Sequence, residues 1–274
     1  MKIGIIGAGW VGVALIERML ASSDELKTSI VATGQSQEKV AYLQSLGVQA
    51  EKISFPISKE STDDVKVFES DILIILIPPQ FKQGKADYPD KIKQIVRMAK
   101  KGNVQRIILT SSTAVYGGLL GEVNEFSSLN FEAEKVALLK EAEDAVLGFS
   151  SDSVVVRLGG LVGPKRHPGR FIHPSRMIKQ ADSYVNLIHQ YDVVSLILSV
   201  IEERKSNGIY NGVADYKIIK RDFYQAAAKS LNMPQPSFED DGKSENRRVI
   251  SERVHDLQNY KPIYENLLNW LEGH

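Results

Sequence analysis

The sequence contains no cysteine, carries no net charge and has no long apolar run. Without cysteine, the 274-residue chain has no disulfide, no thiol nucleophile and no cysteine-ligated zinc, which fits a reducing compartment. Its 34 basic residues balance its 34 acidic residues, so the charge gives no support to a nucleic-acid-binding surface. The longest apolar run, at 72–79, is too short to span a bilayer. We therefore expect a cytoplasmic protein with no membrane or nucleic-acid partner.

The first residues read as a core strand rather than as a signal peptide. An apolar run at 3–6 enters a Gly-x-Gly-x-x-Gly pattern at 7–12, and residues 13–20 read as helix. Strand, glycine turn and helix in this order are the context that the dinucleotide-binding fingerprint requires. The first glycine permits the tight turn, the second lets a diphosphate approach, and the third lets the helix pack on its strand. The predicted cofactor residues here are Gly7, Gly9, Trp10, Val11 and Gly12.

Continuous apolar segments predict a parallel sheet that is buried on both faces. Strands are expected at 27–33, 48–53, 71–77 and 106–110, and helices at 37–46, 90–101 and 131–147. Residues 61–64 have the composition of a helix N-cap. In a doubly wound sheet, ligands lie beyond the carboxyl ends of the strands. We therefore expect Ile77, Pro78 and Pro79 to line the cofactor groove.

The turn after the second strand normally contacts the adenosine ribose. An acidic residue there favours NAD, whereas a basic or hydroxyl group tolerates the 2′-phosphate of NADP. This chain has no acid at that point, and its polar groups are Gln35, Ser36 and Lys39. The pattern leans towards NADP over NAD, although the arginine typical of NADP sites is also missing. Solvated turn and helix residues remain an alternative for all three.

Hydroxyl side chains follow the expected strand at 106–110. Ser111, Ser112 and Thr113 come first, with Tyr116 shortly after. Hydroxyl groups at the carboxyl end of a core strand can hydrogen-bond the oxygen of a reacting carbonyl or alcohol. Small hydroxyl residues also suit strand ends and turns for structural reasons. The pattern alone leaves both interpretations open.

The segment Leu-Thr-Ser-Ser-Thr-Ala-Val-Tyr-Gly at 109–117 resembles the serine motif of extended short-chain dehydrogenases/reductases, the NAD-dependent epimerase/dehydratase family. Further segments are similar to the family in its order: a strand and Gly-Pro loop at 154–164, a short strand entering a helix at 185–194, a late strand at 208–213, and the start of the C-terminal lobe at 221–224. The resemblance implies an α/β fold, with a Rossmann-type doubly wound parallel sheet and a small C-terminal α/β lobe. It assigns 1–158 and 184–213 to the NAD(P)-binding domain, and 159–183 and 214–274 to the substrate-side lobe. It also adds Thr110 and Ser111 to the cofactor contacts.

Two departures from the family pattern bear on the chemistry. Trp10 stands where extended members have glycine, which is similar to the atypical branch of the family. The family's catalytic Tyr-x-x-x-Lys is missing: one frame places Phe131 and Lys135 at its ends, and the other places Lys135 and Leu139 there. Neither frame contains the phenol that acts as the family's acid/base. Lys135 remains a candidate to bind ribose or to act as an acid, with a solvated helix residue as the alternative.

The resemblance makes Ser112 the candidate catalytic serine, with Thr113 beside it and Tyr116 as a substrate contact or substitute acid. A basic loop at 165–170 lies on the substrate side in the family. Its Arg166 and Arg170 are candidates to clamp a phosphate or carboxylate, with a solvated loop as the alternative. His189 is counted as a third substrate-side candidate, although a structural hydrogen bond is its default role. The histidines show no metal-ligand spacing, and we assign no metal.

The sequence therefore predicts an NAD(P)-dependent oxidoreductase or epimerase/dehydratase-like enzyme that lacks the usual tyrosine. It would transfer a hydride on a small hydroxyl, carbonyl or nucleotide-sugar substrate, with Ser112 orienting the substrate oxygen. The alternative is a non-catalytic regulator that senses NAD(P) and binds a protein partner, which the missing tyrosine favours. The apolar face at 267–271 must pack on the body of the protein or on another subunit, so a homodimer is compatible with the sequence.

Overall fold

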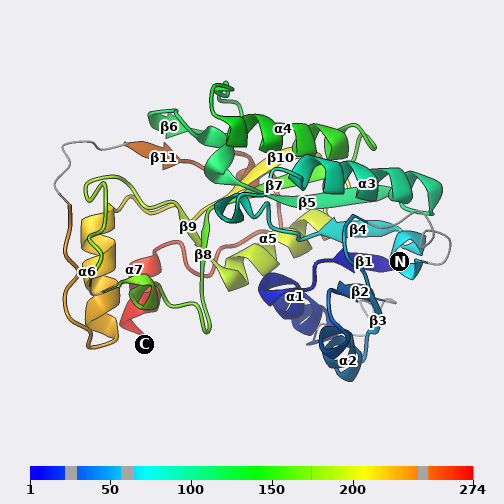
Figure 1. Cartoon of the computed structure of the whole chain (residues 1–274), viewed down its shortest axis with the longest axis horizontal. Helices are drawn as coiled ribbons and strands as arrows, with labels where there is room; N and C mark the ends of the chain where they lie inside the picture. Colours follow the sequence, from blue (N-terminus) through cyan, green and yellow to red (C-terminus); the bar gives the residue numbers. More distant parts are fainter. Residues whose placement is uncertain (22–29, 57–64, 174, 240–245, 274) are drawn as a thin grey trace.

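The computed structural model describes residues 1–21, 30–56, 65–173, 175–239 and 246–273. Within these ranges, seven parallel strands form one sheet in the order β10-β7-β5-β4-β1-β2-β3 (Figure 1). The strands are β1 Ile3–Ile6, β2 Ile30–Gly34, β3 Gln49–Lys52, β4 Ile72–Ile75, β5 Arg106–Ser112, β7 Val154–Leu158 and β10 Gly208–Gly212. The order reverses between β1 and β4, and such a reversal opens a crevice at the carboxyl ends of the two strands. The predicted doubly wound Rossmann-type sheet is confirmed.

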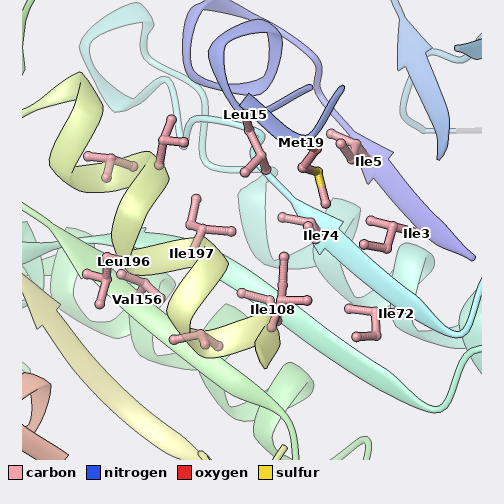
Figure 2. Packing of buried hydrophobic residues seen from close by; sticks show 14 of the residues in the cluster. Ile3, Ile5, Leu15, Met19, Ile72, Ile74, Ile108, Val156, Leu196 and Ile197 are labelled. Carbon is pink, nitrogen blue, oxygen red and sulfur yellow. The ribbon is translucent and has the colours of Figure 1, made fainter. Parts of the chain in front are cut away.

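Helices cover both faces of the sheet (Figure 1). One face carries α1 (Trp10–Ala21), α2 (Gln37–Ser45) and α5 (Gln190–Glu202), and the other carries α3 (Tyr88–Lys101) and α4 (Glu134–Leu147). Alternate strand residues point to opposite faces. Figure 2 shows side chains of β1, β4 and β5 packed against Leu15 and Met19 of α1 and Leu196 and Ile197 of α5, which cover the same face. Two continuous cores thus hold the strand ends in place.

A smaller lobe lies beyond the sheet, on the left of Figure 1. It contains two short parallel pairs, β8 (Gly160–Val162) with β9 (Leu187–His189) and β6 (Gly121–Val123) with β11 (Arg247–Val249). Its helices are α6 (Lys220–Ser230) and α7 (Leu267–Glu272), and Leu267, Trp270 and Leu271 pack on α6 within the same chain. The predicted domain boundaries stay a prediction. Short 3-10 helices complete the chain: η3 Lys66–Glu69, η4 Phe81–Gln83, η5 Thr113–Tyr116, η6 Pro168–Phe171 and η7 Arg253–Asp256.

The structure differs from the sequence expectations at the end of β5. β5 extends to Ser112 instead of ending at residue 110, because Ser111 and Ser112 still pair with Arg157 and Leu158 of β7. The N-cap expected at 61–64 and the start of the strand expected at 27–33 lie outside the described residues. No helix in the described ranges is long and apolar enough to cross a membrane.

Candidate cofactor site

The glycine turn joins β1 to α1 in the geometry that its sequence predicts. Gly7 has φ +86°, a conformation that a side chain disfavours. Its N–H donates to Thr33 Oγ1 of β2 at 3.2 Å, and its carbonyl accepts the Gly9 N–H at 2.6 Å. Helix α1 begins directly after the turn, and the Val13 N–H donates to the Gly9 carbonyl at 3.0 Å. The N–H groups ahead of Val13 belong to the open helix end, which favours an anion.

The other two glycines of the pattern meet different surroundings. A Cβ on Gly12 would lie 3.1 Å from Leu76 Cδ1 and 3.3 Å from the Gly7 carbonyl oxygen, so glycine is needed for close packing. A Cβ on Gly9 would meet only the Gly7 carbonyl oxygen, at 3.8 Å. The protein itself therefore leaves open space at Gly9. This is the space that the approach of a diphosphate requires.

A cavity of about 630 Å³ opens at this turn, at the reversal point of the sheet. Its described lining is Ile6, Gly7, Ala8, Gly9, Trp10, Val11, Gly12, Thr33, Gly34, Gln35, Ser36, Lys39, Ile53, Phe55, Leu76, Ile77, Pro78, Gln80, Leu161 and Arg166. The charged members of this described lining are Lys39 and Arg166, both cations, and it includes no acid. Although the chain is neutral overall, the charged residues of the described cavity lining are all positive, which favours an anionic ligand.

Lys39 reaches the cavity from the first turn of α2, at the carboxyl end of β2. Ser36 is the N-cap of this helix, and its Oγ accepts the Lys39 N–H at 3.2 Å. Burial lowers the pKa of Lys39, and nearby Glu17 partly opposes that shift. The Lys39 ammonium also lies 4.9 Å from the centre of the Tyr42 ring. Gln35, Ser36 and Lys39 come together as the sequence expects, beside the end of β2.

Trp10 connects the glycine turn to the smaller lobe. Its indole Nε1 donates to the Pro164 carbonyl at 3.0 Å, and its own carbonyl accepts from Gln190 Nε2 of α5 at 2.9 Å. The Arg166 guanidinium carbon lies 5.7 Å from the centre of the Trp10 ring, in a cation–π contact. Tryptophan at this position therefore holds the loop after β8 against the start of α1. That contact carries Arg166 to the cofactor cavity.

The serine motif divides between the two faces of β5. Ser112 is half-buried, and its Oγ accepts the Ala114 N–H at 3.1 Å, capping η5. This bond leaves the Ser112 hydroxyl proton available to a substrate oxygen. Thr110 Oγ1 donates to the Ile75 carbonyl at 3.3 Å, and Thr113 is 8% exposed. Ser111 faces the opposite side, where its Oγ donates to Glu143 Oε1 at 2.7 Å.

Ser111 and Tyr116 belong to a buried polar network. Arg157 of β7 forms an ion pair with Glu143 of α4, with 2.7 Å between Nη2 and Oε2. Arg157 Nη1 donates to the Tyr116 hydroxyl at 3.0 Å, and that hydroxyl donates to Asn211 Oδ1 at 2.8 Å. Tyr116 is 0% exposed, and burial raises the pKa of its phenol, against the lowering effect of Arg157. This placement supports a structural role, and the expectation that Tyr116 contacts substrate or replaces the missing acid stays a prediction.

The expected acid/base helix begins later than the sequence pattern indicates. Helix α4 starts at Glu134, so Lys135 lies exposed in its first turn. Phe131 precedes the helix and is 57% exposed, whereas Leu139 is fully buried in the core. Lys135 does not line the described cavity at the glycine turn. Its role as an acid or ribose ligand stays a prediction.

The three substrate-side candidates separate in space. Arg166 lines the cavity at the glycine turn, but Arg170, four residues later in η6, is exposed and does not. His189 is 0% exposed and caps α5, with its Nδ1 accepting the Tyr191 N–H at 3.2 Å. Its ring packs against Tyr264 and Trp270 of the C-terminal segment, with ring centres 4.2 and 4.9 Å away. The burial of His189 supports the structural role that is its default, and its substrate-side assignment stays a prediction.

Most predicted cofactor residues gather around the cavity, and three do not. Pro79, Thr110 and Ser111 lie outside its described lining, and the two hydroxyls bond within the sheet and to α4. Among the lining residues that the sequence reasoning missed are Thr33, Phe55 and Gln80. The first two are at or just after the carboxyl ends of β2 and β3, so the rule that places ligands at strand ends could have identified them.

A second hollow of about 1000 Å³ lies on the outer side of α1, between α1, α2 and α5. Gly9, Trp10 and Lys39 line both hollows, but its other described lining comes mainly from the three helices. Since ligands of this fold bind at strand ends, we assign the cofactor site to the smaller cavity. No group of three or more potential metal ligands occurs within the part of the chain that the structure describes.

Comparisons with known proteins agree with this geometry. A family model described as NADP oxidoreductase coenzyme F420-dependent matches residues 2–99, the segment from β1 to α3. Protein YeeZ of Escherichia coli K12 is 30% identical over 252 residues, which cover 91% of this chain and 90% of the relative.

Two solved structures match nearly the whole chain. UDP-glucuronic acid 4-epimerase from Bacillus cereus, in complex with NAD, has a TM-score of 0.79 at 16% identity and covers 99% of this chain and 96% of its own. A functionally unknown conserved protein from Silicibacter pomeroyi DSS has a TM-score of 0.76 at 21% identity, over 99% of this chain and 97% of its own. At these identities the similarity establishes the fold alone, a Rossmann-type sheet that this chain shares with both structures.

Proposed function

The chain belongs to the family of Escherichia coli protein YeeZ, and on that premise we propose that it is an NAD(P)-dependent oxidoreductase or epimerase-like enzyme. The observation that carries the proposal is the cavity at the glycine turn, whose described charged residues are both cations. The family model for NADP oxidoreductases over 2–99 covers the same turn. The epimerase that shares the fold was solved with NAD.

The described residues fit a dinucleotide. Gly9 leaves open the space at the start of α1 that a diphosphate needs, and the helix end offers N–H groups to it. We place the adenosine ribose beside Gln35, Ser36 and Lys39. Because Lys39 brings a cation and no described lining residue brings an acid, we propose that NADP is preferred over NAD.

Bound dinucleotide would supply the hydride acceptor or donor, and the chain would supply orientation. We propose that Ser112 donates its hydroxyl proton to the oxygen of the reacting carbon, because its acceptor side is already used by Ala114. The substrate is a small hydroxyl, carbonyl or nucleotide-sugar compound that lies between β5 and the smaller lobe. Lys135 is the candidate for proton transfer. Trp10 in the glycine turn and the missing phenol support the atypical branch of the short-chain dehydrogenase/reductase family.

Titration with NADPH and NADH tests the cofactor, with reduced-nicotinamide fluorescence as the signal. We expect both to bind, NADPH more tightly. Gly9→Ala should fold normally, because its Cβ meets no atom closer than 3.8 Å, yet lose binding because the methyl group occupies the diphosphate space. Absence of binding of both dinucleotides to the wild-type protein would refute the proposal.

Turnover is tested by following NADPH oxidation with a panel of carbonyl compounds and nucleotide sugars. We expect at least one substrate to be turned over, and Ser112→Ala to slow it by about 10²–10³-fold, as loss of an oriented hydrogen-bond donor does. An unchanged rate in Ser112→Ala would exclude the proposed role of Ser112. Dinucleotide binding without turnover would favour the alternative, a non-catalytic regulator.

A further inference from the structure

Arg166 reaches the cofactor cavity from the smaller lobe, in a conformation that the loop after β8 imposes. The backbone of Gly163 and Arg166 forms a tight reversal, with the Arg166 N–H donating to the Gly163 carbonyl at 2.9 Å. Lys165, inside the reversal, has φ +62°, and Gly163 has φ +146°. The reversal is fastened to the glycine turn through the Trp10 indole and the Pro164 carbonyl. The backbone therefore brings Arg166 to the same cavity that the start of α1 lines.

The Arg166 guanidinium group is held by a hydrogen bond from its Nε and by cation–π contacts with two aromatic rings. Its Nε donates to the Leu161 carbonyl at 2.9 Å. Its central carbon lies 5.7 Å from the Trp10 ring centre and 5.8 Å from the Phe171 ring centre. Among the described residues, the two terminal nitrogens have no hydrogen-bond or ion-pair partner. The planar fork is thus positioned while its outer donors stay available.

We propose that Arg166 binds the diphosphate bridge of the dinucleotide, opposite the N-terminus of α1, and is not a substrate ligand. This inference rests on the proposed dinucleotide binding. Both groups line one cavity, and the N–H groups of the helix end and a planar guanidinium are complementary to phosphate oxygens. Lys39 reaches the same cavity from α2, beside the ribose end. The two cations therefore serve two different phosphates.

The arrangement also joins the two parts of the chain through the ligand. The α1 end belongs to the parallel sheet domain, and Arg166 belongs to the loop after β8. A diphosphate between them would connect the two, in addition to the existing Trp10–Pro164 hydrogen bond. Mononucleotides that lack the diphosphate bridge would make fewer contacts with Arg166.

The test compares Arg166→Met with wild type by fluorescence titration of NADPH and NADH and by competition with ADP-ribose. Methionine keeps an apolar stem against Trp10 and removes the charge. We expect all three ligands to weaken alike, by about 10- to 100-fold, as loss of hydrogen bonds to a charged group does. Arg166→Lys keeps the charge without the fork and should lose about 3- to 10-fold. Arg170→Met, an exposed arginine outside the cavity, is the matched control and should bind like wild type.

Lys39→Met distinguishes the ribose-phosphate contact from the diphosphate contact. It should lower the affinity for NADPH and leave the affinities for NADH and ADP-ribose unchanged. Wild-type affinity of Arg166→Met for all three ligands, or a loss confined to the KM of a substrate, would overturn the assignment of Arg166. Thermal unfolding of each variant identifies misfolding. If Arg166→Met misfolds, the dinucleotide affinity of Arg166→Lys tests the assignment of Arg166 in its place. Failure of wild type to bind any dinucleotide would refute the proposed function itself, which is a different outcome.

Discussion

Replacing Arg157 by methionine should destabilise the protein strongly, because it removes one half of a buried ion pair. Arg157 is 2% exposed and Glu143 is 0% exposed. Two guanidinium nitrogens donate to the Glu143 carboxylate, at 2.7 Å from Nη2 and at 3.1 Å from Nε to the nearer oxygen. The third, Nη1, donates to the Tyr116 hydroxyl at 3.0 Å. Methionine makes none of these bonds.

The expected loss follows from what remains in the core. Glu143 would keep the Ser111 hydroxyl as a hydrogen-bond donor but would lose its counter-charge. Removing one partner of a buried ion pair costs about 3–5 kcal/mol, whereas an exposed pair contributes about 0–1 kcal/mol. Against a typical free energy of unfolding of about 5–15 kcal/mol, this is a large share.

Urea unfolding at pH 7, followed by circular dichroism, measures the loss in Arg157→Met. Arg97→Met, at an exposed position on α3, is the control and should stay within about 0.5 kcal/mol of wild type. The double variant Glu143→Met with Arg157→Met removes both charges, so it should be more stable than Arg157→Met alone. A loss below about 1 kcal/mol in Arg157→Met, or a double variant that is less stable than the single one, would refute the reasoning.

Three further predictions concern the cavity and the C-terminal segment. Trp10→Phe removes the indole bond to Pro164, so we expect faster amide hydrogen exchange at 163–166 and a stability loss of about 0.5–1.5 kcal/mol; unchanged exchange would contradict it. Because burial lowers the pKa of Lys39, the preference for NADPH over NADH should fall as the pH rises, starting below the usual lysine range, and Lys39→Arg should remove this dependence in paired titrations. Asp192→Ala leaves the N–H groups of 263–264 without their carboxylate acceptor, so urea unfolding should show a loss of about 1–3 kcal/mol, and wild-type stability would count against it.

The local sequence predicted the strands up to β5 and the glycine turn, and the family resemblance added β7 and β10. Apolar runs of strand length between helical segments determine a parallel sheet, since both faces of each strand must be buried. The spacing of Gly7, Gly9 and Gly12 determined the turn, because each glycine meets a constraint within a few residues or on the adjacent strand. The rule for strand ends then placed Ile77, Pro78 and Lys39 at the cavity.

The tertiary structure decided which polar side chains reach the cavity. Ser111 and Ser112 are neighbours in sequence, but alternation along β5 sends one to Glu143 and leaves the other half-buried at the strand end. The motif also could not show that Arg157, on another strand, would bury Tyr116 in a hydrogen-bonded network. Such contacts join residues far apart in the chain, so they cannot be predicted from the local sequence.

The same distinction applies to the two arginines of the basic loop. By itself, the sequence indicated the fold, the position of the glycine turn and a basic stretch at 165–170. It treated Arg166 and Arg170 alike, because both are charged and lie four residues apart. Only the reversal at 163–166 and the bond from Trp10 to Pro164 bring Arg166 to the start of α1 and leave Arg170 outside the cavity. The physical reason is that a charged side chain is directed by the backbone that carries it, and that backbone is held by contacts made more than 150 residues away, at Trp10.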